Sequence, residues 1–241
     1  MSDIPYSTII VSGDDAFDFL QAQLAADLTT LVRPSDGHND EAHEHTVGKP
    51  LLSAWCNPKG RVICLFRVRK TGTGFELTLP SDLTDAVVRR LTMFRFRSKV
   101  DFDVGRIAAE TLGVSGSYED WRLANLQAGV AEIMAAQSEE FTPHMLNLDL
   151  LGAVSVSKGC YPGQEIVSRT HFRGATKRRM LRFESEAPVA PGDKVALDGR
   201  DIGEVLNAIG NELLAVVPVA NAGDALTVNG IQVENRALPY L

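Results

Sequence analysis

The stretch KGCYPGQE occupies residues 158–165 and combines a single cysteine with turn-forming residues. Two glycines and a proline bracket the Cys160–Tyr161 pair, and Gln164 opens an apolar pattern with helical spacing. Glycines permit tight turns and the close approach of a ligand to the backbone. We expect Cys160 just before a helix N-terminus, with Lys158 two residues away, and both features favour a thiolate. The alternative is that Cys160 packs as a small buried hydrophobe.

The composition around this stretch is that of a globular protein. The chain has 241 residues, of which 44% are hydrophobic and 23% are charged. No apolar run approaches the ~20 residues that cross a bilayer. The first residues carry no basic cluster and the first lysine is Lys49, so we predict neither a secretory signal nor a transit peptide. The expected compartment is the cytoplasm.

Cysteine and histidine usage argues against a metal or disulfide framework. Cys56, Cys64 and Cys160 are few and scattered, and the chain has no CxxC, so we expect no zinc ribbon and no cluster held by this chain alone. Three histidines fall among acids within residues 33–49. A polar loop loses entropy when it closes around an ion. We therefore predict no metal site.

The net charge of −7 conceals two basic stretches. Five Lys or Arg fall within residues 89–99 with no acid among them, and residues 158–182 hold seven against one acid. In an acidic protein such stretches indicate a local anion site, or else solvated faces of helices and strands. The net acidity and the lack of a nucleic-acid fold signature argue against direct nucleic-acid binding.

The first part of the chain predicts an α+β layer. A strand at residues 7–11 is followed by a helix whose apolar face includes Phe17, Leu20, Leu24 and Leu28. Further strands are expected at Leu51–Asn57, Arg61–Lys70, Gly74–Leu79 and Val100–Val104, and further helices from Ser81 to Phe94 and over Tyr118–Leu126. This order of one strand, a helix, three strands, a helix and a last strand makes an α+β sheet layer.

The last part of the chain predicts a small antiparallel β-barrel. Short apolar runs, separated by turn residues, are found at Met180–Phe183, Lys194–Leu197, Gly203–Ala208, Leu213–Val217 and Leu226–Val228. Short strands at regular spacing are typical of barrels. We therefore predict two domains, 1–175 and 176–241.

The stretch at 158–165, with Arg169 and the basic residues that follow, closely resembles the signature of the YgfZ family. These are folate-binding, aminomethyltransferase-like proteins of iron–sulfur cluster maintenance. Supporting similarities lie at residues 13–16, 19–24, 57–61, 96–100, 143–148 and 238–240. The resemblance implies an α+β aminomethyltransferase-like folate-binding fold, an antiparallel sheet with helices, followed by the small C-terminal antiparallel β-barrel. Relatives carry another α/β segment where this chain has only residues 102–120 between Asp101 and Trp121, so the chain is a compact form, shortened near 103–120.

The resemblance also implies a function. It points to a tetrahydrofolate-binding accessory protein for the assembly or repair of iron–sulfur enzymes, which thereby supports tRNA methylthiolation. Cys160 would be the working thiol. The other motif residues are Lys158, Gly159, Tyr161, Gly163, Gln164, Glu165 and Arg169. We do not expect glycine-cleavage aminomethyltransferase activity, because Cys64 and Leu65 stand where that enzyme has its catalytic Asp and neither is a good acid or base.

Four further residues correspond to folate contacts of the family. Trp121 and Tyr6 would stack on the pterin, although Trp121 has a core-packing alternative. Gln127 stands where relatives carry a Glu, and can still hydrogen-bond the pterin edge. Arg173 would meet the anionic glutamate tail. The implied cofactor is tetrahydrofolate or a one-carbon derivative.

Two other functions remain open at this point. One is a folate-dependent one-carbon transferase that acts on an unknown amine. The other is a tRNA-binding module that uses the two basic stretches, and its affinity would fall steeply with salt. The leading hypothesis takes folate and iron–sulfur client enzymes, such as tRNA-modifying enzymes, as partners, with no membrane and no direct nucleic-acid contact.

Overall fold

The computed structural model describes residues 4–32, 50–107, 117–174 and 176–241. They form two compact units, each built from several parts of the chain. The sheet unit comprises the described residues up to Ile107 together with Ile133–Glu140 and Gly152–Ile166. The barrel unit comprises residues 117–132, Phe141–Leu151 and the described residues from Val167 onward. Within the described ranges, no helix has the length and apolar character needed to span a bilayer.

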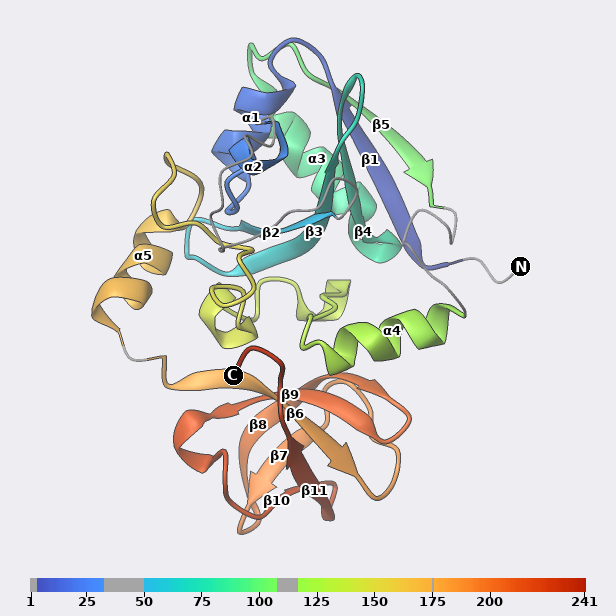
Figure 1. The fold of residues 1–241 in the computed structure, drawn as a ribbon, viewed down its shortest axis with the longest axis vertical. Helices are drawn as coiled ribbons and strands as arrows, with labels where there is room; N and C mark the ends of the chain where they lie inside the picture. Colours follow the sequence, from blue (N-terminus) through green and yellow to red (C-terminus); the bar gives the residue numbers. More distant parts are fainter. Residues whose placement is uncertain (1–3, 33–49, 108–116, 175) are drawn as a thin grey trace, which may run out of the picture. The chain divides into compact units, whose positions relative to one another are not determined.

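The sheet unit is built on five strands (Figure 1). They are β1 (Tyr6–Ser12), β2 (Leu51–Cys56), β3 (Val62–Lys70), β4 (Gly74–Pro80) and β5 (Asp101–Arg106). Their order is β2-β3-β4-β1-β5, and every neighbouring pair is antiparallel. Short turns join β2, β3 and β4 because antiparallel neighbours need only a tight connection. The predicted antiparallel sheet is confirmed.

Helices cover this sheet through a shared apolar core. They are α1 (Ala16–Gln23), α2 (Thr29–Val32) and α3 (Thr84–Arg95), the last preceded by a 3₁₀ turn at Ser81–Leu83. Leu20 of α1 and Leu91 of α3 are fully buried in one cluster with Leu77 of β4. Full burial of such side chains contributes roughly 1.5–3 kcal/mol each. Truncation of Leu91 to Ala should therefore cost about 2–5 kcal/mol.

The predicted helix through Leu28 is wrong, because α1 ends at Gln23. Leu24 is already extended, with ψ 150°. The Asp27 carboxylate accepts hydrogen bonds from the Thr29 amide and hydroxyl and from the Gln21 side chain. Short polar side chains of this kind compete with helical hydrogen bonds and favour caps. Leu24 and Leu28 are nevertheless buried, as their spacing predicted.

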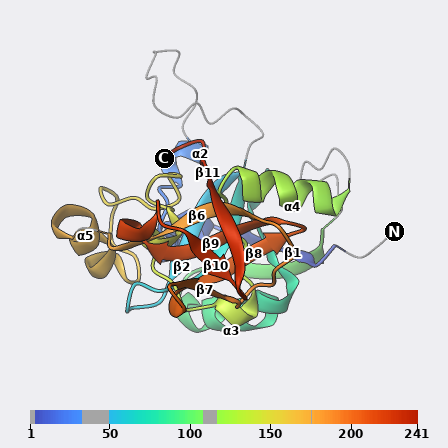
Figure 2. The same cartoon turned by 90° about the horizontal axis from the view of Figure 1, so that it is seen from below.

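The barrel unit contains a closed six-stranded barrel (Figure 2). Its strands are β6 (Arg178–Ser185), β7 (Lys194–Leu197), β8 (Arg200–Ile209), β9 (Glu212–Pro218), β10 (Leu226–Val228) and β11 (Ile231–Arg236). The order is β10-β11-β6-β9-β8-β7, which the antiparallel pair β7–β10 closes. The predicted barrel is confirmed, but β11 was not foreseen. Residues 234–236 of that strand are all polar or charged, so its apolar signal is weak.

The barrel unit also includes a helix that precedes the barrel strands in the sequence. α4 (Tyr118–Gln127) begins at Ser117, whose hydroxyl accepts from the Asp120 amide in a capping box. The Asn207 side-chain amide of β8 pairs with the backbone of Glu132 just after α4, with bonds of 2.9 and 2.8 Å. Among the described residues, 3₁₀ turns of this unit lie at Pro143–Leu146 and Val219–Asn221, and another, at Ala135–Gln137, belongs to the sheet unit.

The two compact units are defined by contacts in space, and no single position in the chain divides one from the other. The barrel strands begin at Arg178, close to the boundary expected after 175, yet α4 and residues 141–151 cluster with them. α5 (Gln164–Arg173) starts in the sheet unit and ends in the barrel unit. The histidines of 33–49 lie outside the described residues, as does half of the segment expected to be shortened, residues 108–116.

Candidate functional site around Cys160

Cys160 is exposed, whereas Cys56 and Cys64 are buried in β2 and β3. Burial raises the pKa of the Cys56 thiol to about 12. Burial, and then the nearby Asp82 carboxylate, also raises the pKa of Cys64. A buried thiol of this kind stays protonated and unreactive. The solvent-facing position of Cys160 excludes the alternative in which it packs as a small hydrophobe.

Lys158 anchors the segment before Cys160 to the end of α1. Its Nζ donates to three backbone carbonyls, those of Gln21 at 2.6 Å, Leu24 at 2.8 Å and Ala26 at 2.9 Å. These bonds use all three ammonium protons. The carbonyl end of a helix favours a cation. Burial lowers the pKa of Lys158 to about 8, against the opposing effect of Asp27. Lys158 was expected to favour the thiolate of Cys160, but its three protons go to main-chain carbonyls.

Two further side chains of the motif hold the same loop from within. The buried Tyr161 hydroxyl donates to the Ser155 carbonyl at 2.9 Å. Burial raises the pKa of this phenol above its ordinary value, so it remains a hydrogen-bond donor. The Gln164 amide donates to the Lys158 carbonyl at 3.1 Å. These two hydrogen bonds therefore hold the loop on both sides of Cys160.

The glycines of the motif differ in their surroundings. Gly163 has φ +80°, and a Cβ placed on it would stand 2.5 Å from the Asn57 carbonyl oxygen and 2.8 Å from the Gly60 Cα. Gly159 has no neighbouring atom within 4 Å of an added Cβ. At position 163, therefore, only glycine lets the chain lie against the β2–β3 turn. Position 159 has no such restriction. α5 begins directly after this contact, four positions past Cys160.

The β2–β3 turn that receives Gly163 is itself braced. The Asn57 side-chain oxygen accepts from the amides of Lys59 at 2.9 Å and Arg61 at 3.0 Å. The Asn57 amide group donates to Glu139, whose other carboxylate oxygen pairs with Arg90 of α3 at 2.6 Å. Hydrogen bonds from Asn57 and then Arg90 lower the pKa of the Glu139 carboxyl. Glu139 was not among the predicted site residues, because no local pattern marks a residue whose partners lie 82 and 49 positions away in the sequence.

These contacts define what the site can do chemically. The backbone on both sides of Cys160 is fixed by buried or half-buried groups, while its sulfur faces solvent. Such a thiol can bind a soft metal ion or attack an accessible electrophile presented from outside. The remaining motif residues Glu165 and Arg169 lie exposed on α5.

Two of the predicted folate residues lie on α4. Trp121 is half-buried and stacks on Tyr118, with ring centroids 5.8 Å apart. The Glu132 carboxylate accepts from the Tyr118 hydroxyl at 3.1 Å and pairs with Arg122 at 2.9 Å, which orients this aromatic pair. Gln127 is exposed and donates to Glu212 at 3.3 Å. Six helical positions separate Trp121 from Gln127, so their side chains project roughly a third of a turn apart.

The other two predicted folate residues have different surroundings. Tyr6 lies on β1 of the sheet unit and is 7% exposed, so its ring offers little surface for stacking. Arg173 is the exposed last residue of α5 and belongs to the barrel unit with Trp121 and Gln127.

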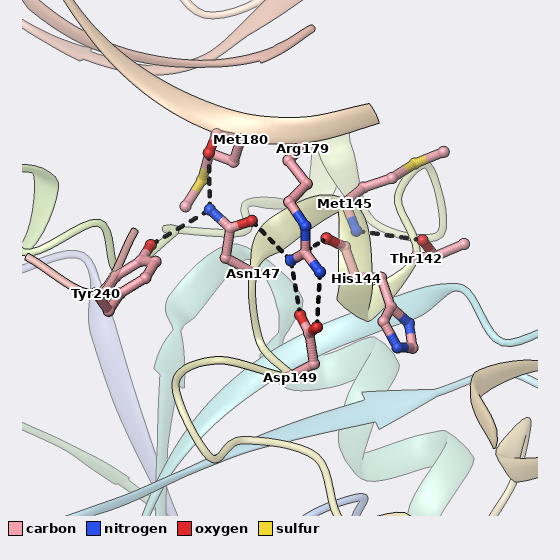
Figure 3. Close-up of polar contacts among 8 residues, drawn as sticks. All are labelled: Thr142, His144, Met145, Asn147, Asp149, Arg179, Met180 and Tyr240. Carbon is pink, nitrogen blue, oxygen red and sulfur yellow. Dashed lines mark hydrogen bonds and ion pairs between the residues drawn. The ribbon is translucent and has the colours of Figure 1, made fainter. Parts of the chain in front are cut away.

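A buried polar cluster in the barrel unit was not predicted (Figure 3). Arg179 binds Asp149 through two bonds, of 3.0 and 2.8 Å, and also donates to the Asn147 side chain at 3.1 Å. The Asn147 amide donates to the Met180 carbonyl at 2.7 Å and to the Tyr240 hydroxyl at 3.4 Å, and that hydroxyl donates to the Gly129 carbonyl. These separate segments meet only in the folded chain.

Comparison with known proteins extends these observations. Residues 177–238 match the family model of the CAF17 C-terminal β-barrel domain. The tRNA-modifying protein YgfZ of an Enterobacter species is 26% identical over 270 aligned residues, covering 86% of this chain and 77% of that protein. The YgfZ of Klebsiella pneumoniae is 27% identical over 271 residues, with 83% and 77% covered. The chain is therefore similar to YgfZ proteins over most of its length.

The similarity to YgfZ includes the site described above. A continuous match over 86% of the chain necessarily contains residues 158–165. Among solved structures, glycine cleavage system aminomethyltransferase T from Bartonella henselae superposes with a TM-score of 0.68 over 99% of this chain and 85% of its own. The identity is 15%, so this likeness establishes the fold alone. The expected aminomethyltransferase-like fold with a C-terminal barrel is confirmed.

Proposed function

We propose that this chain is a tetrahydrofolate-binding accessory protein that acts in the cytoplasm on iron–sulfur enzymes, and through them on tRNA methylthiolation. Its homology to YgfZ proteins, which are named as tRNA-modifying, supports a role related to tRNA modification. The aminomethyltransferase-like fold supports the link to folate.

The observation that carries the proposal is the exposed Cys160 on a loop held by buried anchors. Iron–sulfur centres are bound by thiolates, which are soft ligands. Cys160 would act as a transient ligand to iron of a client enzyme, giving its thiol proton to solvent water and displacing a water ligand as the sulfur–iron bond forms. Because the backbone around Cys160 is already fixed, less conformational entropy is lost when the thiol binds the iron. Cys56 and Cys64 are buried and cannot take this role without unfolding.

The folate would be held by side chains of the barrel unit. Trp121 offers an aromatic face, Gln127 offers amide donors and an acceptor, and Arg173 offers an exposed guanidinium for a carboxylate. These groups suit a flat pterin with an anionic tail, whereas the buried Tyr6 contributes little surface. Bound tetrahydrofolate supplies one-carbon chemistry, and the protein residues bind and orient it.

Complementation tests the proposal. In a bacterium that lacks its own YgfZ gene, methylthiolated tRNA is measured after expression of the wild type, Cys160→Ala or Ser157→Ala. We expect rescue by the wild type and by Ser157→Ala, an exposed change three residues away, but not by Cys160→Ala. All three proteins must be soluble at equal level. Full rescue by Cys160→Ala would overturn the role of the thiol.

The same experiment separates the transferase alternative. If the wild type fails to rescue, the accessory role is lost and a folate-dependent one-carbon transferase becomes the better hypothesis. That activity predicts a loss of methylenetetrahydrofolate that depends on an added amine. It needs an acid or base, and Cys64 does not supply one, because burial keeps its thiol protonated.

A further inference from the structure

The end of α3 presents an aromatic residue in a costly backbone conformation. Phe96 terminates the helix with φ 43° and ψ −110°. Residues other than glycine adopt positive φ at an energetic cost, which persists only where the surroundings enforce it. The side chain gains nothing from burial, because it is 91% exposed. A strained and solvent-exposed phenylalanine points to a role outside the fold itself.

The loop that carries Phe96 is clamped to the start of α1. The Lys99 amide donates to the Asp15 carboxylate at 2.7 Å, and the Asp15 amide donates to the Lys99 carbonyl at 3.3 Å. A Cβ on Gly13 would stand 2.2 Å from that carbonyl oxygen, so only glycine permits the approach. The loop is therefore held at two points. Phe96 lies in this loop, three residues before Lys99.

Around Phe96 lies a surface that we call the α3 patch. It consists of exposed apolar and exposed basic side chains: Met93, Phe94, Phe96, Arg89, Arg97 and Lys99. Met93 is 68% exposed and Phe94 41%. A pocket of about 390 Å³ adjoins the patch, with Arg95, Phe96 and Asp101 in its wall.

The composition of the patch matches the centre of protein interfaces, where Phe, Met and Arg are enriched. Lys99 is paired with Asp14 at 3.2 Å, and Arg95 with Asp101 at 3.5 Å. Arg89 and Arg97 make no ion pair with any residue that the structure describes, so their charges face outward. Asp14 and Asp101 border the same pocket, but each is already paired with a cation, whereas a phosphate backbone would leave the exposed Phe and Met side chains without an apolar partner. A protein partner fits this pattern better than RNA.

We propose that the α3 patch is the docking surface for an acidic, apolar segment of the iron–sulfur client enzyme. The inference rests on the proposed function, since that function supplies the client. Phe96 and Met93 form the apolar contact, and Arg89 and Arg97 meet carboxylates of the partner. A rigid aromatic side chain loses little entropy on binding, so it is suited to be an anchor.

The probe is a purified [4Fe–4S] tRNA-methylthiolating enzyme, titrated against the full chain in biolayer interferometry. We expect Phe96→Gly to weaken binding at least tenfold, the usual scale for loss of an interface anchor. Glycine accepts the backbone at this position, so Phe96→Gly should not lower the melting temperature. Arg97→Glu should also weaken binding, by a margin that shrinks as salt rises. Matched controls are Val104→Ser and Arg200→Glu, exposed positions outside the patch, which should leave binding unchanged.

The outcomes distinguish this proposal from the one on which it rests. Unchanged binding by Phe96→Gly overturns the docking surface, as does a wild type that rescues methylthiolation without binding the enzyme. Failure of the wild type to rescue overturns the proposed function. A parallel titration with unmodified tRNA tests the other class of partner. Binding of tRNA that Phe96→Gly abolishes would assign the patch to RNA and overturn the proposal.

Discussion

Gly163, three residues after the exposed thiol, lies directly against Gly60 in the β2–β3 turn. A Cβ on Gly163 would stand 2.8 Å from the Gly60 Cα. The two glycines come from motifs about a hundred residues apart, and each has positive φ, +80° and +69°. The signature around Cys160 thus includes a packing requirement as well as a reactive group.

This contact predicts unequal effects for the two glycines of the signature. Gly163→Ala forces a Cβ into the turn and strains the backbone, so we expect a loss of roughly 2 kcal/mol or more in the free energy of unfolding. Gly159→Ala enters open space and should change it by less than about 0.5 kcal/mol. Urea denaturation followed by circular dichroism measures both. Equal effects would contradict the role assigned to the contact.

Lys158 should matter through its three hydrogen bonds. Lys158→Met keeps the apolar stem but leaves the carbonyls of Gln21, Leu24 and Ala26 without their donor. We expect a loss of about 2–3 kcal/mol, the scale for unsatisfied half-buried polar groups. Amide exchange should quicken in peptides that cover residues 155–163. Lys59→Met, at an exposed position, is the matched control and should leave exchange unchanged.

Breaking the ion pair of Arg179 and Asp149 should destabilise the protein strongly, whereas replacing both residues by apolar ones should destabilise it much less. The two side chains are 18% and 10% exposed, so Asp149→Ala leaves a largely buried guanidinium unpaired. We expect a loss of about 3 kcal/mol. The double variant Arg179→Met with Asp149→Leu should recover much of it, because no buried charge remains. Thermal unfolding of the single and double variants tests this, and an equally unstable double variant would refute it.

The Glu139 carboxylate should make part of the protein's folding stability sensitive to acid. Its folded pKa is depressed below the ordinary 4.5, first by the hydrogen bond from Asn57 and then by Arg90. Its contribution is therefore present at neutral pH and is lost as pH falls from about 4.5 through the lower folded value. The contribution should be at most about 1 kcal/mol, because the side chain is 41% exposed.

The variant Glu139→Gln removes this carboxylate and so measures its contribution to the pH dependence of stability. Between pH 6 and pH 3 the variant should lose less stability than the wild type in urea titrations at each pH. Glu140→Gln, at the neighbouring exposed position, is the control and should follow the wild-type curve. Identical slopes for all three proteins would mean that the Glu139 carboxylate contributes nothing in this range.

Local patterns in the chain were sufficient for most elements. The polar turn at Asn57–Gly60, set between apolar runs, predicted the β2–β3 hairpin, and the apolar spacing after Gln164 predicted the start of α5. Such signals succeed because turns and helices are stabilised by residues within a few positions of one another. The true end of α1 was missed, because side-chain hydrogen bonds around Asp27 outweigh the apolar periodicity that continues to Leu28.

The sequence by itself determined the signature at 158–165, the antiparallel sheet and the barrel, since periodicity and turn residues express these locally. Only the tertiary structure decided that Cys160 faces solvent and that Lys158 reaches the end of α1, 134 residues away from Leu24. It likewise brought Glu139 to Asn57 and Arg179 to Asp149. Burial, ion pairing and the fit of Gly163 against Gly60 depend on distances between segments remote in sequence. Those distances exist only once the apolar core has closed.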